Sequence, residues 1–285
     1  MEESCYYKLH VREVLPELFL RPYIRRYYFF ENKEGINRFS FHALSNGFVE
    51  ILLLLDNYRI LLHQEHKKVQ TASFISGIME LNQISKVEVD IPDVPFRGVG
   101  ILLSPLGVNR LLGSNLKALT NRVLDLRDFW SVGARWFQHN VQNNGSEAIR
   151  IDNLNHYFLK QLEVYSVDSQ KIIPVLQKLE QMTGYLQVGK VATELGVSYK
   201  WLYRRFVDDL GMTPKSYLRI LRFDRACYML DHYRGINETN IAHQCGYYDQ
   251  AHFLHEFKKI MRISPGEYVR RQLGRFYFNR ANVFQ

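Results

Sequence analysis

The sequence predicts an α+β protein, in which a β-rich, barrel-like N-terminal domain precedes an all-α C-terminal domain with two helix–turn–helix subdomains. Three observations predict this class: short apolar runs broken by turn residues in the N-terminal part, apolar residues at helical spacing from Pro105 onward, and a motif of about fifty residues that occurs twice. We expect a first domain at 1–145, a helix and linker at 146–169, a second domain at 170–273, and a tail at 274–285.

The composition is that of a folded protein. Of 285 residues 46% are hydrophobic, so each domain can bury a core, and disordered or collagen-like classes are excluded. The longest apolar run, Ile51–Leu55, is too short to span a membrane, and the charged N-terminal residues do not form a signal peptide. Three widely spaced cysteines are typical of a reducing compartment: Cys5, Cys227 and Cys245. We therefore expect a soluble cytoplasmic protein.

Short strands are expected throughout the N-terminal part. The apolar or alternating runs are 27–30, 48–55, 58–62 and 87–91, and turn-forming residues separate them. Residues 55–58 are expected to form a hairpin turn, because Asp and Asn tolerate positive φ. Aromatic residues of this region either line a small-molecule pocket or fill the core; they are Tyr27, Tyr28, Phe29, Phe30, Phe39 and Phe41.

Helical patterns begin at Pro105 and strengthen after the polar loop at 143–146. Between residues 147 and 166 the apolar positions recur at steps of three and four, which predicts an amphipathic helix. This helix either forms the seam of a homodimer or packs on its own domain. Residues 166–169 then form a short polar linker.

The excess of positive charge lies in the C-terminal part. Residues 168–285 carry 18 Lys and Arg against 11 Asp and Glu, a balance of 18 − 11 = +7, whereas residues 1–167 carry 19 against 18, a balance of +1. This asymmetry favours a module that binds a polyanion, attached to a nearly neutral module. Double-stranded DNA is the polyanion that the following motif favours.

The C-terminal part contains an internal repeat. Ala192 and Gly196 match Ala242 and Gly246 at an offset of 50 residues, and the offset then becomes 51 because one residue is added in the turn. At the offset of 51 residues the matching pairs are Leu202 with Phe253, Phe206 with Phe257, Thr213 with Ser264, Pro214 with Pro265, and Tyr217 with Tyr268. Two copies are too few for a solenoid, so this is a duplicated motif.

Each copy of the motif predicts a helix–turn–helix. A glycine supplies the turn, Ser198 or Asp249 caps the second helix, and two large apolar residues one turn apart anchor it. Projection at 100° per residue places Lys200, Arg204 and Val207 on the outward face of the first such helix, with Tyr203 at its border. On the second helix the outward positions are Ala251, His255 and Lys258, with Leu254 at the border. Arg205 and Lys259 flank these faces and are expected to reach phosphates.

These residues resemble the AraC/XylS family of bacterial transcription regulators. The pieces that carry the resemblance are Gly246–Phe253, Phe257–Lys258 and Ser264–Tyr268 in the second copy, together with Val191–Ala192, Gly196–Ser198, Gly211, Thr213–Pro214 and Tyr217 in the first. The resemblance covers roughly residues 170–272. Arg262 departs from the pattern, because the family usually has glycine there.

The resemblance implies seven helices, with one connecting helix at about 214–232 between two helix–turn–helix subdomains. It implies two recognition helices in successive major-groove segments of double-stranded DNA. The family's base-contacting positions fall on Lys200, Tyr203 and Arg204 in the first copy, and on Gln250, Ala251, Leu254 and His255 in the second. A looser resemblance links residues 20–27, 46–48 and 96–112 to a companion domain that senses an effector, dimerises, or both. An activator of this kind would also contact RNA polymerase.

Other sites are weaker hypotheses. His42, Glu50, His63 and His66 could hold a metal, and Cys5 could be a reactive thiol, but nearby residues support neither. Because no nucleophile–base pair, P-loop or dinucleotide motif is present, we expect no enzyme, cofactor or metal site. The competing hypothesis is a small-molecule-binding protein whose helical part is an output arm. The basic, aromatic tail from Arg270 onward docks on its own domain or contacts phosphates.

Overall fold

The computed structural model describes most of the chain. The described residues are 9–32, 39–42, 47–56, 58–64, 67–79, 81, 86–90, 95–143, 145–165, 172–181, 188–233 and 235–270, with the backbone alone for some of them. The chain divides into two compact units, and the boundary between them along the sequence falls between residues 167 and 168.

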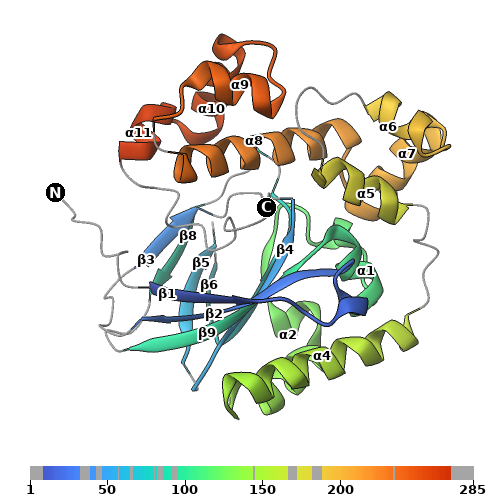
Figure 1. Cartoon of the computed structure of the whole chain (residues 1–285). Helices are drawn as coiled ribbons and strands as arrows, with labels where there is room; N and C mark the ends of the chain where they lie inside the picture. Colours follow the sequence, from blue (N-terminus) through green and yellow to red (C-terminus); the bar gives the residue numbers. More distant parts are fainter. Residues whose placement is uncertain are drawn as a thin grey trace. The chain divides into compact units, whose positions relative to one another are not determined.

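The described strands of the first unit form two antiparallel sheets (Figure 1). The larger sheet has the order β1 (Leu9–Val14), β2 (Ile24–Asn32), β9 (Phe96–Leu103), β4 (Val49–Leu54), β7 (Ser73–Ser76), β10 (Val123–Asp125). The smaller sheet has the order β3 (Phe39–His42), β8 (Lys86–Asp90), β5 (Ile60–Gln64), β6 (Lys67–Thr71). The β-rich prediction is confirmed. The barrel-like shape is not, because in the described residues β1 and β10 remain unpaired edges and neither sheet closes.

The expected hairpin at residues 55–58 is a turn but not a hairpin. Asp56 has φ +59°, and the Tyr58 N–H donates to the Leu55 carbonyl at 3.2 Å, as the turn residues predict. However, β4 pairs with β7 and β9, whereas β5 pairs with β6 and β8. Because both edges of β4 are already occupied, this turn carries the chain from one sheet to the other.

Aromatic residues of β2 form part of the core of the first unit. Tyr27, Tyr28, Phe29 and Phe30 are buried, so for these four the core interpretation holds; the side chains of Phe39 and Phe41 lie outside the described residues. Tyr28 and Phe30 lie opposite Gly100 and Gly98 of β9, and their rings occupy the space that a β-carbon on either glycine would need. Burial, together with the charge of Glu17, raises the pKa of Tyr27 well above its ordinary value.

Helices cover the strands of the first unit. They are α1 (Pro105–Leu112), α2 (Leu126–Phe129), α3 (Ser131–Phe137) and α4 (Glu147–Val164), with short helical turns η1 (Leu18–Leu20), η2 (Leu116–Ala118) and η3 (Gln138–Gln142). The helix predicted at 147–166 is therefore confirmed, and Ser146 caps it. Its Leu154 and Phe158 are fully buried, and the Phe158 ring meets Phe137 of α3, so this face packs on its own unit. None of the described helices is long and apolar enough to cross a membrane.

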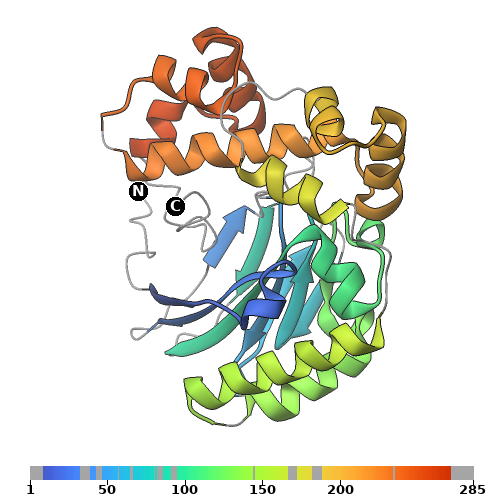
Figure 2. The same cartoon turned by 45° about the vertical axis from the view of Figure 1, so that its right-hand side comes forward.

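The second unit is all-α in its described residues, as predicted. Its seven helices are α5 (Ile172–Gln181), α6 (Val188–Glu194), α7 (Tyr199–Arg205), α8 (Pro214–His232), α9 (Glu238–Cys245), α10 (Gln250–Met261) and α11 (Pro265–Arg270); a π-helical turn, η4 (Phe206–Leu210), continues α7. Helix α8 coincides with the expected connecting helix. Figures 1 and 2 show α5, α6 and α7 around the beginning of α8, and α9, α10 and α11 along the rest of it.

Replacement of Gly100 by alanine tests the aromatic–glycine packing. A β-carbon at Gly100 would lie 1.9 Å from Tyr28 Cζ, so we expect Gly100→Ala to lower the free energy of unfolding by about 1–3 kcal/mol. Urea denaturation of the full chain measures this loss. Gly189→Ala is the control, since nothing lies within 4 Å of the corresponding β-carbon. If the two alanine variants were equally stable, the close packing at Gly100 would be wrong.

Candidate nucleic-acid interface

The two helix–turn–helix units share the same turn. Gly196 and Gly246 follow α6 and α9 with φ of +65° and +77°, a left-handed conformation that glycine adopts without strain. In each unit the residue after this glycine donates its N–H to an alanine carbonyl five residues earlier, Val197 to Ala192 at 2.9 Å and Tyr247 to Ala242 at 2.8 Å. This bond is typical of a helix C-terminus that ends in glycine, and its repetition shows that the duplication in the sequence is also structural.

The predicted capping residues begin both second helices. The Ser198 hydroxyl accepts the Trp201 N–H at 3.2 Å, and the Asp249 carboxylate accepts the His252 N–H at 2.7 Å. Each cap satisfies a backbone donor that has no partner within its helix. The start of each helix is therefore fixed locally by the sequence.

Large apolar anchors hold the inner face of each second helix. Leu202 and Phe206 in the first unit and Phe253 and Phe257 in the second are fully buried, as the repeat predicts. The next helix in each unit supplies an aromatic partner: Phe206 meets Tyr217 with 5.6 Å between ring centroids, and Phe257 meets Tyr268 at 5.5 Å. With the inner faces occupied in this way, the opposite faces of α7 and α10 are exposed.

The outward face of α7 carries Lys200, Tyr203 and Arg204, all exposed. Arg204 is 82% exposed and lies 3.5 Å from the Asp208 carboxylate, a surface ion pair that costs little to break. Arg205 differs, because its side chain is only 30% exposed and bonds Asp209 at 2.7 Å. Burial raises the pKa of the Asp209 carboxyl, although the Arg205 charge opposes this shift. Arg204 is therefore the more available cation of the two.

The outward face of α10 is chemically sparser. Ala251, His255, Lys258 and Lys259 are exposed, and Leu254 is half-buried, which agrees with the projection. Gln250 is exposed but engaged: its amide donates to Glu238 at 3.0 Å and its carbonyl accepts from Thr239 at 2.8 Å, both on α9. To contact a base, Gln250 would have to exchange these bonds. Lys258 and Lys259, near the end of α10, are exposed cations of this face.

Two exposed tyrosines near the starts of α7 and α10 were not singled out from the sequence. Tyr199 follows the cap of α7 and lies beside Tyr203, with 6.4 Å between ring centroids. Tyr248 precedes the cap of α10, is 87% exposed, and is held through its N–H, which donates to His252 Nδ1 at 3.3 Å. The signal that could have found them is an aromatic residue next to a predicted N-cap, where helix N-termini meet phosphates.

The alternative sites gain no new support. His66 and Cys5 lie outside the described residues, as do the side chains of His42 and His63 and the tail beyond Arg270. In the part of the chain that the structure describes, no three His, Cys, Asp or Glu side chains gather as metal ligands. Cys227 and Cys245 are buried, and burial raises the pKa of Cys245 to about 12, which keeps this thiol protonated.

Comparison with known proteins identifies the C-terminal domain, which contains both helix–turn–helix units. Residues 191–271 match a family model described as "Helix-turn-helix domain". The HTH-type transcriptional activator RhaS of Escherichia coli (strain K12 / DH10B) is 35% identical over 75 residues, which are 26% of this chain and 27% of RhaS. The C-terminal domain is an AraC-type helix–turn–helix domain. The match thus spans about a quarter of the length of RhaS.

The remaining comparisons are a family model over the N-terminal part and two solved structures. Residues 12–125 match a family described as "Domain of unknown function (DUF6597)". ToxT from Vibrio cholerae O395 aligns over 93% of this chain and 98% of its own, with 13% identity and a TM-score of 0.45. The C-terminal domain of AraT, a response regulator from Geobacillus stearothermophilus, aligns over 37% of this chain and 88% of its own, with 29% identity and a TM-score of 0.33.

Within the AraC-type domain, Arg262 keeps a turn that glycine forms in the first unit. It ends α10 with φ +61°, and its N–H donates to the Lys258 carbonyl at 2.9 Å. Gly211, its counterpart at an offset of 51 residues, has φ +70°. The turn therefore keeps the same backbone conformation even though arginine stands where the family usually has glycine. The left-handed conformation instead costs this arginine about 1–2 kcal/mol of strain.

Replacement of Arg262 tests this strain. We expect Arg262→Gly to raise the free energy of unfolding by up to about 1 kcal/mol, because relief of strain outweighs the greater entropy of the unfolded chain. Urea denaturation of the full chain measures the change. Arg262→Ala is the matched control, since it also removes the guanidinium but keeps the β-carbon, and should show no gain. Equal stability of the two variants would contradict the strain.

Proposed function

We propose that this protein is a sequence-specific DNA-binding transcription regulator that inserts α7 and α10 into adjacent major-groove segments. The observation that carries the proposal is the structural duplication: both units have the same glycine turn, N-cap and buried anchors, and both present an exposed face. An α-helix fits the major groove of B-DNA, where each base pair offers a distinct pattern of donors and acceptors. Two such helices on one domain suit two neighbouring recognition boxes.

The two faces suit different parts of DNA. Arg204 can donate to O6 and N7 of guanine, and Lys200 and Tyr203 add a further cation and a hydroxyl. On α10, Ala251 and Leu254 suit apolar contact with a thymine methyl, and the His255 imidazole can bond a base edge. Lys258 and Lys259, and less freely Arg205, are proposed to contact phosphates. Since α10 has fewer hydrogen-bonding groups, the second box should tolerate more base changes.

The N-terminal unit is proposed to modulate DNA binding, by sensing a small-molecule effector, by forming a homodimer, or both. An activator would also contact RNA polymerase. The proposed compartment is the cytoplasm, because three widely spaced cysteines are typical of a reducing environment. The competing proposal is a small-molecule-binding protein, which a thermal-shift screen of the full chain against metabolites would support if DNA selection failed.

Selection of binding sites from random duplex DNA by the full chain, at two salt concentrations, tests the proposed function. We expect a motif with two boxes about one helical turn apart. Binding that weakens with salt and yields no motif would show the electrostatic contribution alone, and sequence-specific recognition would be wrong.

Arg204→Ala tests direct base contact by α7. We expect a loss of about 1–3 kcal/mol in discrimination at one base pair of the first box, because alanine cannot donate to guanine. Affinities for duplexes substituted at each position of the motif measure the effect. Lys160→Ala on α4 is a control with the same change of charge at an exposed site. Unchanged discrimination throughout the first box would exclude Arg204 as a base-contacting residue.

Lys259→Ala tests phosphate contact by α10. We expect affinity to fall alike for all sequences, and the slope of log affinity against log salt to fall by about 1, because one released counterion is lost. Titration of specific and random duplexes over a range of salt concentrations measures both quantities. A loss confined to the selected motif would instead assign Lys259 to a base edge.

A further inference from the structure

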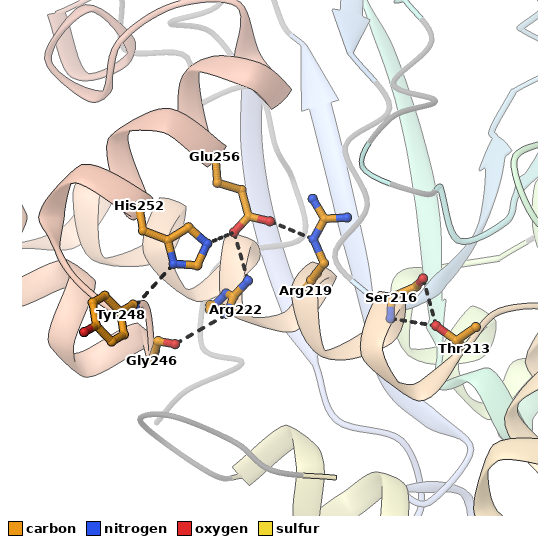
Figure 3. A network of polar contacts seen from close by, with 8 residues as sticks. All are labelled: Thr213, Ser216, Arg219, Arg222, Gly246, Tyr248, His252 and Glu256. Atoms are coloured by element: carbon orange, nitrogen blue, oxygen red, sulfur yellow. Dashed lines mark hydrogen bonds and ion pairs between the residues drawn. The ribbon is translucent and has the colours of Figure 1, made fainter.

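A buried carboxylate joins the second recognition helix to the connecting helix. Glu256 of α10 has a side chain only 6% exposed, and both of its oxygens accept hydrogen bonds from α8 (Figure 3). Arg219 Nε donates to Oε1 at 2.7 Å, and Arg222 Nη2 donates to Oε2 at 2.9 Å. The two arginines are three residues apart, so they lie on one face of α8 and hold the carboxylate between them.

Arg222 extends this contact to the turn before α10. Its guanidinium carbon lies 4.5 Å from the centroid of the buried Tyr247 ring, and its Nη1 donates to the Gly246 carbonyl at 3.4 Å. One arginine of α8 thus contacts the glycine turn, the residue after it, and the recognition helix. Arg222 thus holds both the turn that leads into α10 and, through Glu256, the helix itself.

A histidine on the outer side of the cluster contacts the same turn. His252 Nε2 lies 4.0 Å from the Glu256 carboxylate, and His252 Nδ1 accepts the Tyr248 N–H at 3.3 Å (Figure 3). The backbone just before the α10 cap is therefore linked to the first turn of the helix.

The first unit is built differently at the equivalent position. At the offset of 51 residues, Glu256 corresponds to Arg205, which pairs with Asp209 four residues along its own helix. Next to Arg205, Phe206 meets α8 through an apolar ring contact with Tyr217. Arg205 thus forms an ion pair along its own helix, whereas the ion pairs of Glu256 join two helices.

A buried ion pair is weak evidence for stability, and in some proteins its role is to specify one geometry. Desolvation offsets much of the attraction between its charges, while apolar packing alone tolerates small shifts of one helix on another. A carboxylate held by two arginines of one rigid helix has few alternative positions. Base contacts need side chains held to within about 0.5 Å, so such a constraint affects recognition directly.

We propose that Glu256, with Arg219 and Arg222, is a positioning cluster that fixes the orientation of α10 on α8 and thereby determines base discrimination by the second unit. The effect on DNA rests on the proposed function; the effect on α10 does not. The cluster acts through Ala251, Leu254 and His255, and itself contacts no base.

The first test is Glu256→Gln, which keeps the shape of the side chain but removes its charge. Using the selected motif, we expect discrimination between bases in the second box to fall at least about tenfold, and discrimination in the first box to change less than about twofold. Glu163→Gln, at an exposed site on α4, is the matched control. Equal losses in both boxes, or none, would overturn the proposal.

A second variant guards against simple loss of folding. Arg219→Met, Arg222→Met and Glu256→Met combined replace the cluster by apolar residues, which commonly preserve stability. We expect this variant to melt within a few degrees of the parent chain and still to lose second-box discrimination. Retention of that discrimination would overturn the proposal.

Amide hydrogen exchange of the full chain without DNA supplies a test independent of DNA. In Glu256→Gln we expect exchange to quicken at least about fivefold in residues 246–261 and to stay unchanged in residues 196–210. If the parent chain selected no DNA motif, the proposed function would fail, while this exchange pattern would still decide the positioning role. Uniform change across both segments, or no change, would contradict it.

Discussion

The packing of both helix–turn–helix units on α8 is the constraint on which the second domain depends. Phe206 meets Tyr217 near the beginning of α8, and Phe257 meets Phe223 farther along it, with 5.4 Å between ring centroids. Tyr268 adds a hydrogen bond to Asp231 near the end of α8. With 19 residues, α8 is about 28 Å long, a length comparable to the roughly 34 Å of one turn of B-DNA. One continuous helix thus suits the spacing of two neighbouring major-groove segments.

Local features of this domain could be predicted from the sequence because short-range interactions determine them. A glycine with positive φ and a Ser or Asp at an N-cap act within a few residues, so Gly246 and Asp249 took their expected roles. The inner anchors followed from helical period. The outward faces followed in turn, since they are what remains once the anchors are buried.

Features that depend on tertiary pairing could not be predicted in this way. The sequence does not show that Gln250 is bonded to α9, that Arg205 pairs along its own helix, or that Glu256 meets two arginines of α8. In the N-terminal unit, the alternation of apolar residues predicted strands, but it did not predict which strands pair with each other. The turn at Asp56 therefore suggested a hairpin, whereas β4 already pairs on both edges. The predicted local conformation of this turn was correct, whereas the predicted pairing of the strands on either side of it was wrong.

In the proposed function, α7 and α10 differ in how chemistry and geometry contribute to recognition. Helix α7 carries long side chains with several donors, such as Arg204, which can adjust to a base even if the helix moves slightly. Helix α10 presents Ala251 and Leu254, whose apolar contacts are short in range and cannot compensate for a displaced backbone. The helix with fewer adaptable groups therefore needs the more exact placement, and it is the one that a buried carboxylate joins to α8. Because the duplicated motif fixes the turns and anchors alike in both helix–turn–helix units, the proposed positioning role would let a difference at one equivalent position separate the specificities of the two units.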